Sequence, residues 1–174
     1  YVNYSPLITY GVCVLMTYNI SIQCTGVVVM ITHIKYHYIN GDCMLDCLVL
    51  GDSIAVGTQM FRQECVLVGK GGINSRQFNK NYSQKIEPAE TVIISLGSND
   101  HDGVNSFKEL LSLRQRVEGK RVFWILPAIK PHIQDMVQII AKNFGDTVLP
   151  IRGISTDNIH PTGSGYKDIV TRVK

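Results

Sequence analysis

From residue 44 onward, short apolar runs alternate with segments in which apolar residues recur every three or four positions. The apolar runs are rich in β-branched residues, as buried strands are. They cover residues 45–50, 65–69, 91–96, 121–126 and 147–151. The segments that follow them predict helices over residues 54–62, 75–84, 104–117, 131–144 and 163–173. Because strands that alternate with helices form parallel sheets covered on both faces, we expect an α/β domain with a mainly parallel sheet of about five strands.

The first 43 residues have a different pattern. Residues 1–34 contain no Asp, Glu, Lys or Arg, and the first such charge is Lys35. Their apolar stretch is long enough to span a bilayer, but four polar residues between positions 19 and 25 interrupt its middle. A membrane segment, extra strands packed on the main domain and a sequence outside the functional fold are the alternatives. We favour the third, with a hydrophobic N-terminal segment over 1–43 and the functional domain over 44–174.

The balance of charge excludes one class of function. The net charge is only +3, and 18% of the residues are charged. Lys70, Arg76, Lys80 and Lys85 are scattered along a polar stretch, which is the usual pattern of a solvated surface. No run of Lys and Arg is dense enough to bind a nucleic acid, so we expect no such partner.

The cysteines bear on the cellular setting and on metal binding. Cys13, Cys24, Cys43, Cys47 and Cys65 are odd in number and make a poor disulfide framework. Unpaired cysteines favour a reducing, cytoplasmic setting, with membrane anchoring as the alternative. Three residues separate Cys43 from Cys47, but no second Cys/His pair stands at metal-ligand spacing, so no metal site is predicted.

Sites in parallel sheets form at the carboxyl ends of the strands, so the residues after each apolar run are candidates for chemistry. After 45–50 comes GDSIAVG, in which Gly51 permits a sharp turn and Ser53 stands in the first turn of a helix. Taken alone, this stretch is explained better by a helix cap at Asp52 or Ser53 than by catalysis. After 65–69 comes GKGGINSRQF, which is not a phosphate loop because Gly71 stands where Ser or Thr is required.

The last two candidate stretches are GSND and STDNIHPTGSGY. Asn99 offers a side-chain amide after the third strand, although all four residues there also suit a plain turn. Near the C-terminus, Asp157 and His160 lie three residues apart, and Pro161 restrains the backbone of His160 toward an extended conformation. Jointly the four stretches bring a serine, a backbone N–H, an amide donor and an Asp/His pair to one sheet edge. Those are the parts that a hydrolase needs.

This ordered set resembles the SGNH (GDSL-like) hydrolase superfamily over residues 44–174, with 1–43 outside it. The blocks GSND and DNIHPTGSGY are close to the family patterns GxND and DxxHPxxxGY. Gly71 and Gly72 both precede INSR, and the spacing to Arg76 and Phe78 selects Gly72; Ile54 stands where the family name has Leu. The resemblance implies a three-layer α/β/α sandwich of the flavodoxin-like kind.

The resemblance also implies roles for particular residues. Ser53 would be the nucleophile, His160 its base, and Asp157 the group that orients and stabilises the imidazole. The backbone N–H groups of Ser53 and Gly72 and the side-chain amide of Asn99 would form the oxyanion hole. Asp52 and His101 are further candidates for substrate contacts. Neither a metal nor a cofactor is required.

These roles predict a serine ester hydrolase that works through an acyl-enzyme. The short stretch between the third and last blocks leaves few residues for a lid, which favours a small acyl group, such as acetyl, on a carbohydrate or similar alcohol. The partner is then a small-molecule or carbohydrate ester, and membrane contact through 1–34 is open but not favoured. A lysophospholipase or thioesterase, an acyltransferase, and a membrane-tethered, non-catalytic binding domain are the alternatives. The last should have lost one of the site residues, and the chain retains them all.

Overall fold

The computed structural model describes residues 12–13, 22–23, 26–27, 36–39 and 42–173, with side chains from residue 44 onward. Most of the described strands belong to one seven-stranded sheet. Its strands are β1 (Val12–Cys13), β4 (Tyr36–Ile39), β5 (Asp42–Gly51), β6 (Val66–Gly69), β7 (Ala89–Ser95), β8 (Gly119–Ile125) and β9 (Thr147–Leu149). A separate two-stranded sheet pairs β2 (Ile22–Gln23) with β3 (Gly26–Val27).

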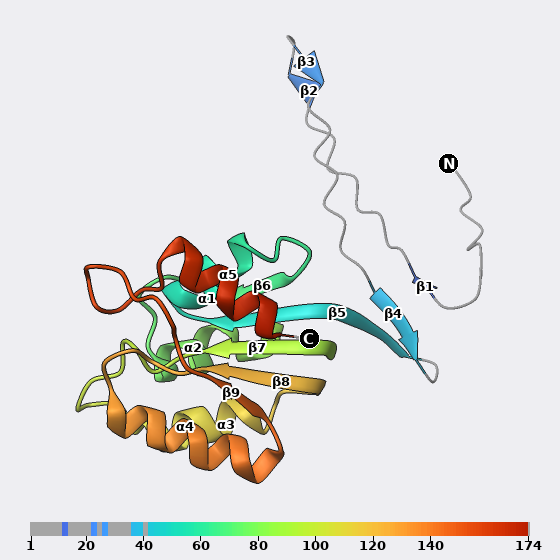
Figure 1. The fold of residues 1–174 in the computed structure, drawn as a ribbon. Coiled ribbons are helices and arrows are strands. Elements are labelled where there is room, and N and C mark those ends of the chain that lie inside the picture. The colour runs from blue at the N-terminus through green and yellow to red at the C-terminus, as the bar shows by residue number, and fades with distance from the viewer. Residues whose placement is uncertain (1–11, 14–21, 24–25, 28–35, 40–41, 174) are drawn as a thin grey trace.

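The five strands from β5 onward are parallel and run in the order β6-β5-β7-β8-β9 (Figure 1). Strand β5 is central to the site because the chain continues from it to β6 on one side and later to β7 on the other. In register, Gly51 at the end of β5 pairs with Gly69 of β6 and with Ser95 of β7. A reversal of strand order of this kind opens a crevice beyond the carboxyl ends of the strands, where ligands bind.

Helices cover both faces of this sheet (Figure 1). One face carries α1 (Ser53–Met60) and α5 (Gly163–Arg172), and the other carries α2 (Ser75–Tyr82), α3 (Ser106–Arg114) and α4 (Pro131–Phe144). Two buried clusters match the two faces. Val49 and Ile93 pack with Ile54 and Ile169 on the first face. Their neighbours along the strands, among them Leu50 and Ile94, pack with Phe78, Leu110 and Val137 on the second. The three-layer α/β/α prediction is confirmed.

Local chemistry explains where the elements begin and end. The predicted strand 147–151 ends at Leu149, because Pro150 has no N–H for the ladder. The predicted helix 104–117 is shorter, since the Asn105 side chain accepts from Lys108 N at 3.2 Å and starts α3 there. Helix α4 has the predicted bounds. It begins with Pro131, and Gly145, in the left-handed conformation, caps its C-terminus after Phe144.

The described parts of the N-terminal segment are short strands. Strand β4 adds antiparallel to the beginning of β5, with Tyr36 opposite Leu45, and β1 pairs with β4. Of the three alternatives for residues 1–43, the one that predicts extra strands agrees with these described positions. Strand β5 begins at Asp42, so the predicted boundary at residue 44 falls inside a strand. Among the described residues, no helix combines the length and apolarity needed to cross a membrane. The separate roles of 1–43 and 44–174 stay a prediction.

A disulfide corrects the expectation that the cysteines are unpaired. Cys47 in β5 bonds to Cys65, and both residues are buried on the α1 face. Leu48 pairs with Val66 in the parallel ladder, so Cys47 and Cys65 stand side by side one position earlier. That adjacency depends on strand register, which cysteine counting does not supply. The side chains of the other three cysteines lie outside the described residues.

Candidate active site

Ser53 lies at the first position of α1, directly after a sharp turn at the end of β5. The turn requires glycine at position 51, since its φ is +139° and a Cβ there would collide with the carbonyl oxygen of Ser95. Asp52 caps the helix, with Oδ1 accepting from Ile54 N at 3.0 Å and from the Ser95 hydroxyl at 3.1 Å. The turn and the cap together fix the position from which the Ser53 side chain projects.

His160 and Asp157 meet Ser53 from the loop before α5. Nε2 of His160 lies 2.8 Å from Ser53 Oγ, and Nδ1 lies 2.7 Å from Oδ2 of Asp157. A serine hydroxyl, an imidazole and a carboxylate are therefore joined in one chain of hydrogen bonds. In such a chain the imidazole can take the hydroxyl proton while the carboxylate stabilises the resulting positive charge.

The other oxygen of Asp157 is held by its own loop. Its Oδ1 accepts from the Ser155 hydroxyl at 2.6 Å, from Ile159 N at 2.8 Å and from His160 N at 2.9 Å. These bonds hold the pKa of the Asp157 carboxyl well below its usual range, and the bond from Ser155 has the largest effect. The carboxylate is therefore ionised at neutral pH, and its side chain is 48% exposed, so little desolvation opposes the charge.

Backbone pairing closes the loop that carries Asp157 and His160. Ile154 and Pro161 form an antiparallel bridge, and Ser155 N donates to His160 O at 2.8 Å. Immediately after it, Thr162 caps α5 by accepting from Gly165 N at 3.1 Å. The imidazole thus lies on a loop whose two ends are hydrogen-bonded to each other and whose last residues lead directly into the capped start of α5.

The loop after β6 passes beside Ser53. It leaves the sheet with Lys70 N bonded to Gly51 O at 3.0 Å, and a Cβ on Gly71 would stand 3.8 Å from that of Ser53. Gly72 follows with a φ of +74°, a conformation that glycine adopts without strain. The side chain of Asn99 donates to Ile73 O at 3.1 Å, which uses one of its two N–H bonds. Ser53, the Gly71–Gly72 backbone and Asn99 therefore converge at one sheet edge.

Asp100 joins the two loops on which Gly72 and Asn99 lie. It is buried, and its carboxylate accepts from Ser75 N at 2.8 Å and from the Ser75 hydroxyl at 2.7 Å. Lys130 Nζ also donates to the backbone oxygen of Asp100. Asp100 belongs to the GSND stretch, whose pattern alone assigns it no function. The only signal was an acidic residue next to Asn99, and such a residue suits a plain turn equally well.

The two further candidates for substrate contact have different surroundings. Asp52 is fully buried beneath the start of α1, where its carboxyl stabilises the turn instead of facing a substrate. Burial raises its pKa to about 6, and the hydrogen bonds from Ile54 and Ser95 offset part of that rise. His101 is exposed in the loop after Asp100, and its Nδ1 accepts from Gly103 N at 3.2 Å.

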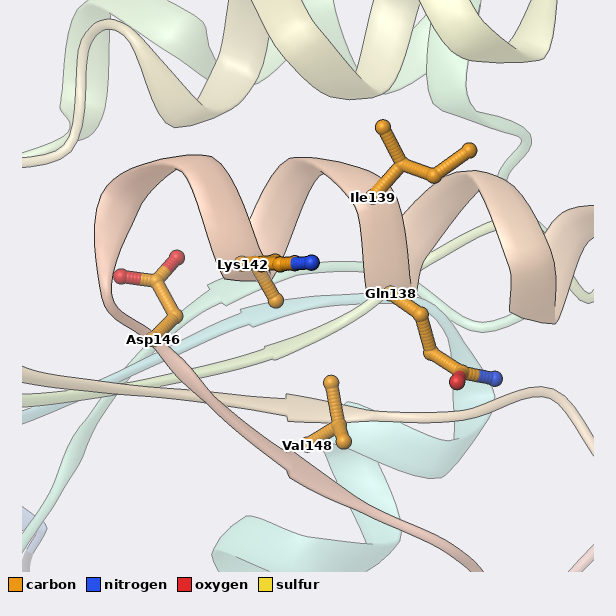
Figure 2. Close-up of a pocket in the computed structure, with 6 residues that line it drawn as sticks. Gln138, Ile139, Lys142, Asp146 and Val148 are labelled. Atoms are coloured by element: carbon orange, nitrogen blue, oxygen red, sulfur yellow. The ribbon is translucent and has the colours of Figure 1, made fainter.

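A hollow elsewhere in the described chain has its carboxylate already engaged. A hollow of about 340 Å³ lies against α4 and the start of β9, with Lys142, Asp146 and Val148 around it (Figure 2). Its carboxylate, Asp146, is already committed to Arg114 at 2.6 Å and to the Trp124 indole at 2.9 Å. No group of three metal-ligating side chains occurs within the described residues.

Comparison with known proteins places this fold among solved structures. No protein-family model and no curated protein matches the chain. A protein of Bacteroides fragilis assigned as an acylhydrolase matches with a TM-score of 0.54 and 17% identity, over 74% of this chain and 83% of that one. A protein of Bacteroides uniformis assigned as a GDSL-like lipase matches with a TM-score of 0.51 and 14% identity, over 74% and 93% of the two chains. The chain has the fold of the SGNH (GDSL-like) hydrolases.

Proposed function

We propose that the chain is a serine ester hydrolase in which Ser53, His160 and Asp157 form the catalytic triad. The observation that carries the proposal is the unbroken series of hydrogen bonds from Ser53 Oγ through the imidazole to Asp157. Ser53 Oγ attacks the ester carbonyl carbon while Nε2 of His160 accepts the hydroxyl proton. The ionised Asp157 keeps the imidazole oriented and stabilises its protonated form.

Stabilisation of the tetrahedral intermediate is the second part of the proposal. The oxyanion receives hydrogen bonds from the backbone N–H groups of Ser53 and Gly72 and from the remaining N–H of Asn99. Loss of one such donor typically costs about 100- to 1000-fold in rate. His160 then gives its proton to the leaving alcohol, and the acyl group stays on Ser53. A water molecule, deprotonated in turn by His160, releases the acid.

The openness of the site supports a small acyl group on a larger alcohol. The side chains of His160 and Asp157 are 37% and 48% exposed, so a bulky alcohol such as a sugar can approach them. A long acyl chain, by contrast, is bound best where an apolar channel removes it from water. We therefore propose deacetylation of a carbohydrate or a similar alcohol as the reaction.

Hydrolysis of p-nitrophenyl acetate, butyrate and octanoate by the wild type and by Ser53→Ala tests this function. We expect the wild-type kcat/KM to fall as the acyl chain lengthens, and Ser53→Ala to lose at least about 1000-fold on the acetate. Ser112→Ala, a serine in α3, controls for a general effect of losing a hydroxyl and should behave as wild type. Equal, slow rates in wild type and Ser53→Ala on all three esters would refute the proposal.

A further inference from the structure

A second hollow lies directly beside the candidate active site. It has a volume of about 250 Å³ and lies between the loop Lys70–Ile73 and three polar or aromatic residues of α2. Those three are Gln77, Asn81 and Tyr82. None of the roles proposed above uses Lys70 or these α2 side chains.

The same glycine loop borders both the hollow and Ser53. Gly71 and Gly72 line the hollow, and Gly71 is also the residue whose added Cβ would stand 3.8 Å from the Cβ of Ser53. Ile73 lines it as well, and its carbonyl oxygen holds the Asn99 amide. An ester bound with its carbonyl carbon at Ser53 can therefore extend one substituent over this glycine loop and into the hollow.

Cations gather in the chain segment that forms this hollow. Residues 65–86 contain the four cations Lys70, Arg76, Lys80 and Lys85 and no Asp or Glu. In the described part of the chain, Arg76 pairs with Glu109 at 3.6 Å, whereas no carboxylate is within ion-pair distance of Lys70. The ammonium of Lys85 lies 5.4 Å from the ring centre of Tyr82, one of the lining residues. Lys70 is the one charged residue among those that line the hollow, and its cation attracts an anion.

The polar groups of the lining suit a small oxyanion. Lys70 contributes one full charge, and the amide of Asn81 can add N–H donors. Gln77 uses its Oε1 to accept from Asn74 N at 3.2 Å, which leaves its amide N–H groups for a ligand. One cation surrounded by neutral donors matches a single negative charge better than a phosphate dianion.

We propose that this hollow binds a carboxylate on the alcohol part of the substrate, so that the preferred substrates are acyl esters of acidic alcohols. The inference rests on the proposed ester hydrolysis and adds to it the class of alcohol. Lys70 would be a specificity-determining residue, because it holds the carboxylate while Ser53 acts on the ester group.

The test compares esters that differ only in charge. The 3- and 4-isomers of acetoxybenzoate carry a carboxylate beside an acetyl ester, and their methyl esters are the neutral counterparts. For each enzyme variant the quantity of interest is the ratio of kcat/KM for the anionic ester to kcat/KM for its methyl ester. We expect Lys70→Gln to lower this ratio about three- to five-fold for at least one isomer, mainly through a higher KM. In the wild type the ratio should also fall between low and high salt.

Lys80→Gln is the matched control, because it removes the same charge from α2 at a position that does not line the hollow. It should leave the ratio within two-fold of wild type. A ratio unchanged by Lys70→Gln for both isomers, or lowered equally by Lys80→Gln, would overturn the carboxylate site while leaving ester hydrolysis standing. If neither the anionic nor the neutral esters were hydrolysed faster than by Ser53→Ala, the proposed function itself would fail, and this inference with it.

Discussion

Two aspartates next to the candidate nucleophile have opposite environments. Asp157 is exposed but accepts three hydrogen bonds at one oxygen, which lowers its pKa. Asp52 is fully buried, and desolvation raises its pKa to about 6. Its Oδ2 makes no hydrogen bond of ordinary length among the described residues, although the neighbouring Ser98 hydroxyl helps to lower the pKa. Asp157 thus keeps its charge without cost to the fold, whereas ionising Asp52 costs free energy of folding.

This difference predicts a pH-dependent effect of Asp52→Asn. Because the native pKa lies above the usual value of 3.8, the native state holds the Asp52 proton more tightly than the unfolded chain does. The resulting stability is present below about pH 4 and is lost as the pH rises through about 6. Asparagine keeps the acceptor for Ile54 N and never ionises. Relative to wild type, the free energy of unfolding of the variant should rise by about 2 to 3 kcal/mol between pH 4 and pH 7.5.

Urea unfolding at the two pH values measures this change. Asp168→Asn, which alters an aspartate of α5, serves as the comparison at the same net charge. A difference between Asp52→Asn and wild type that stayed constant from pH 4 to pH 7.5 would show that Asp52 does not titrate in this range in the folded protein.

At the scale of elements, Asp100 connects the loop after β7 to the start of α2. Its two hydrogen bonds to Ser75 hold the loops that carry Asn99 and Gly72 in a fixed relation. Asp100 is a positioning residue, since it would act on the reaction only through these loops. Asp100→Ala should lower kcat on p-nitrophenyl acetate about 10- to 100-fold with a small change in KM, as a misplaced oxyanion donor does.

Two further measurements separate positioning from a general loss of stability. Asp100→Asn retains an acceptor for Ser75 N and should recover part of the lost kcat. Removing a buried hydrogen-bonded group costs about 1–3 kcal/mol, so both variants should remain folded at 25 °C by circular dichroism. Full activity in a folded Asp100→Ala would exclude the positioning role.

The elements themselves were largely predictable, because short apolar runs mark the strands and apolar residues recur between them in the helices. Boundaries shifted where one residue decides them, as Pro150 does for β9 and Asn105 for α3. The approach of Ser53 to His160 also followed from the sequence, since parallel strands deliver their carboxyl ends to one edge. The burial of Asp52 and the bond between Asp100 and Ser75 did not follow. Side-chain direction after a turn depends on the packed helices, and local pattern does not encode it.

At the scale of the whole molecule, one covalent bond links the middle of strand β5 to the residue before β6. The Cys47–Cys65 disulfide, with a sequence separation of 18, encloses all of α1 and the turn that bears Ser53. Closing a loop of this length restricts the unfolded chain and typically adds about 3 kcal/mol to stability. We expect dithiothreitol to lower the unfolding free energy by about that amount.

The double variant Cys47→Ala/Cys65→Ala distinguishes the bond from other effects of the reductant. Its stability should be lower than that of the wild type and unaffected by dithiothreitol, as measured by urea unfolding. Wild-type protein whose unfolding curve is the same with and without reductant under unfolding conditions would show that the bond does not stabilise the fold.

The exposure of the Asp157–His160 loop has a consequence for the fate of the covalent intermediate. An acetyl group carried on Ser53 would stand beside an imidazole that is itself 37% exposed, within reach of bulk solvent. Water at its full concentration would then compete with any added alcohol for the acyl group. The intermediate would therefore be short-lived in water, and the same opening that admits water would admit an added alcohol as acceptor.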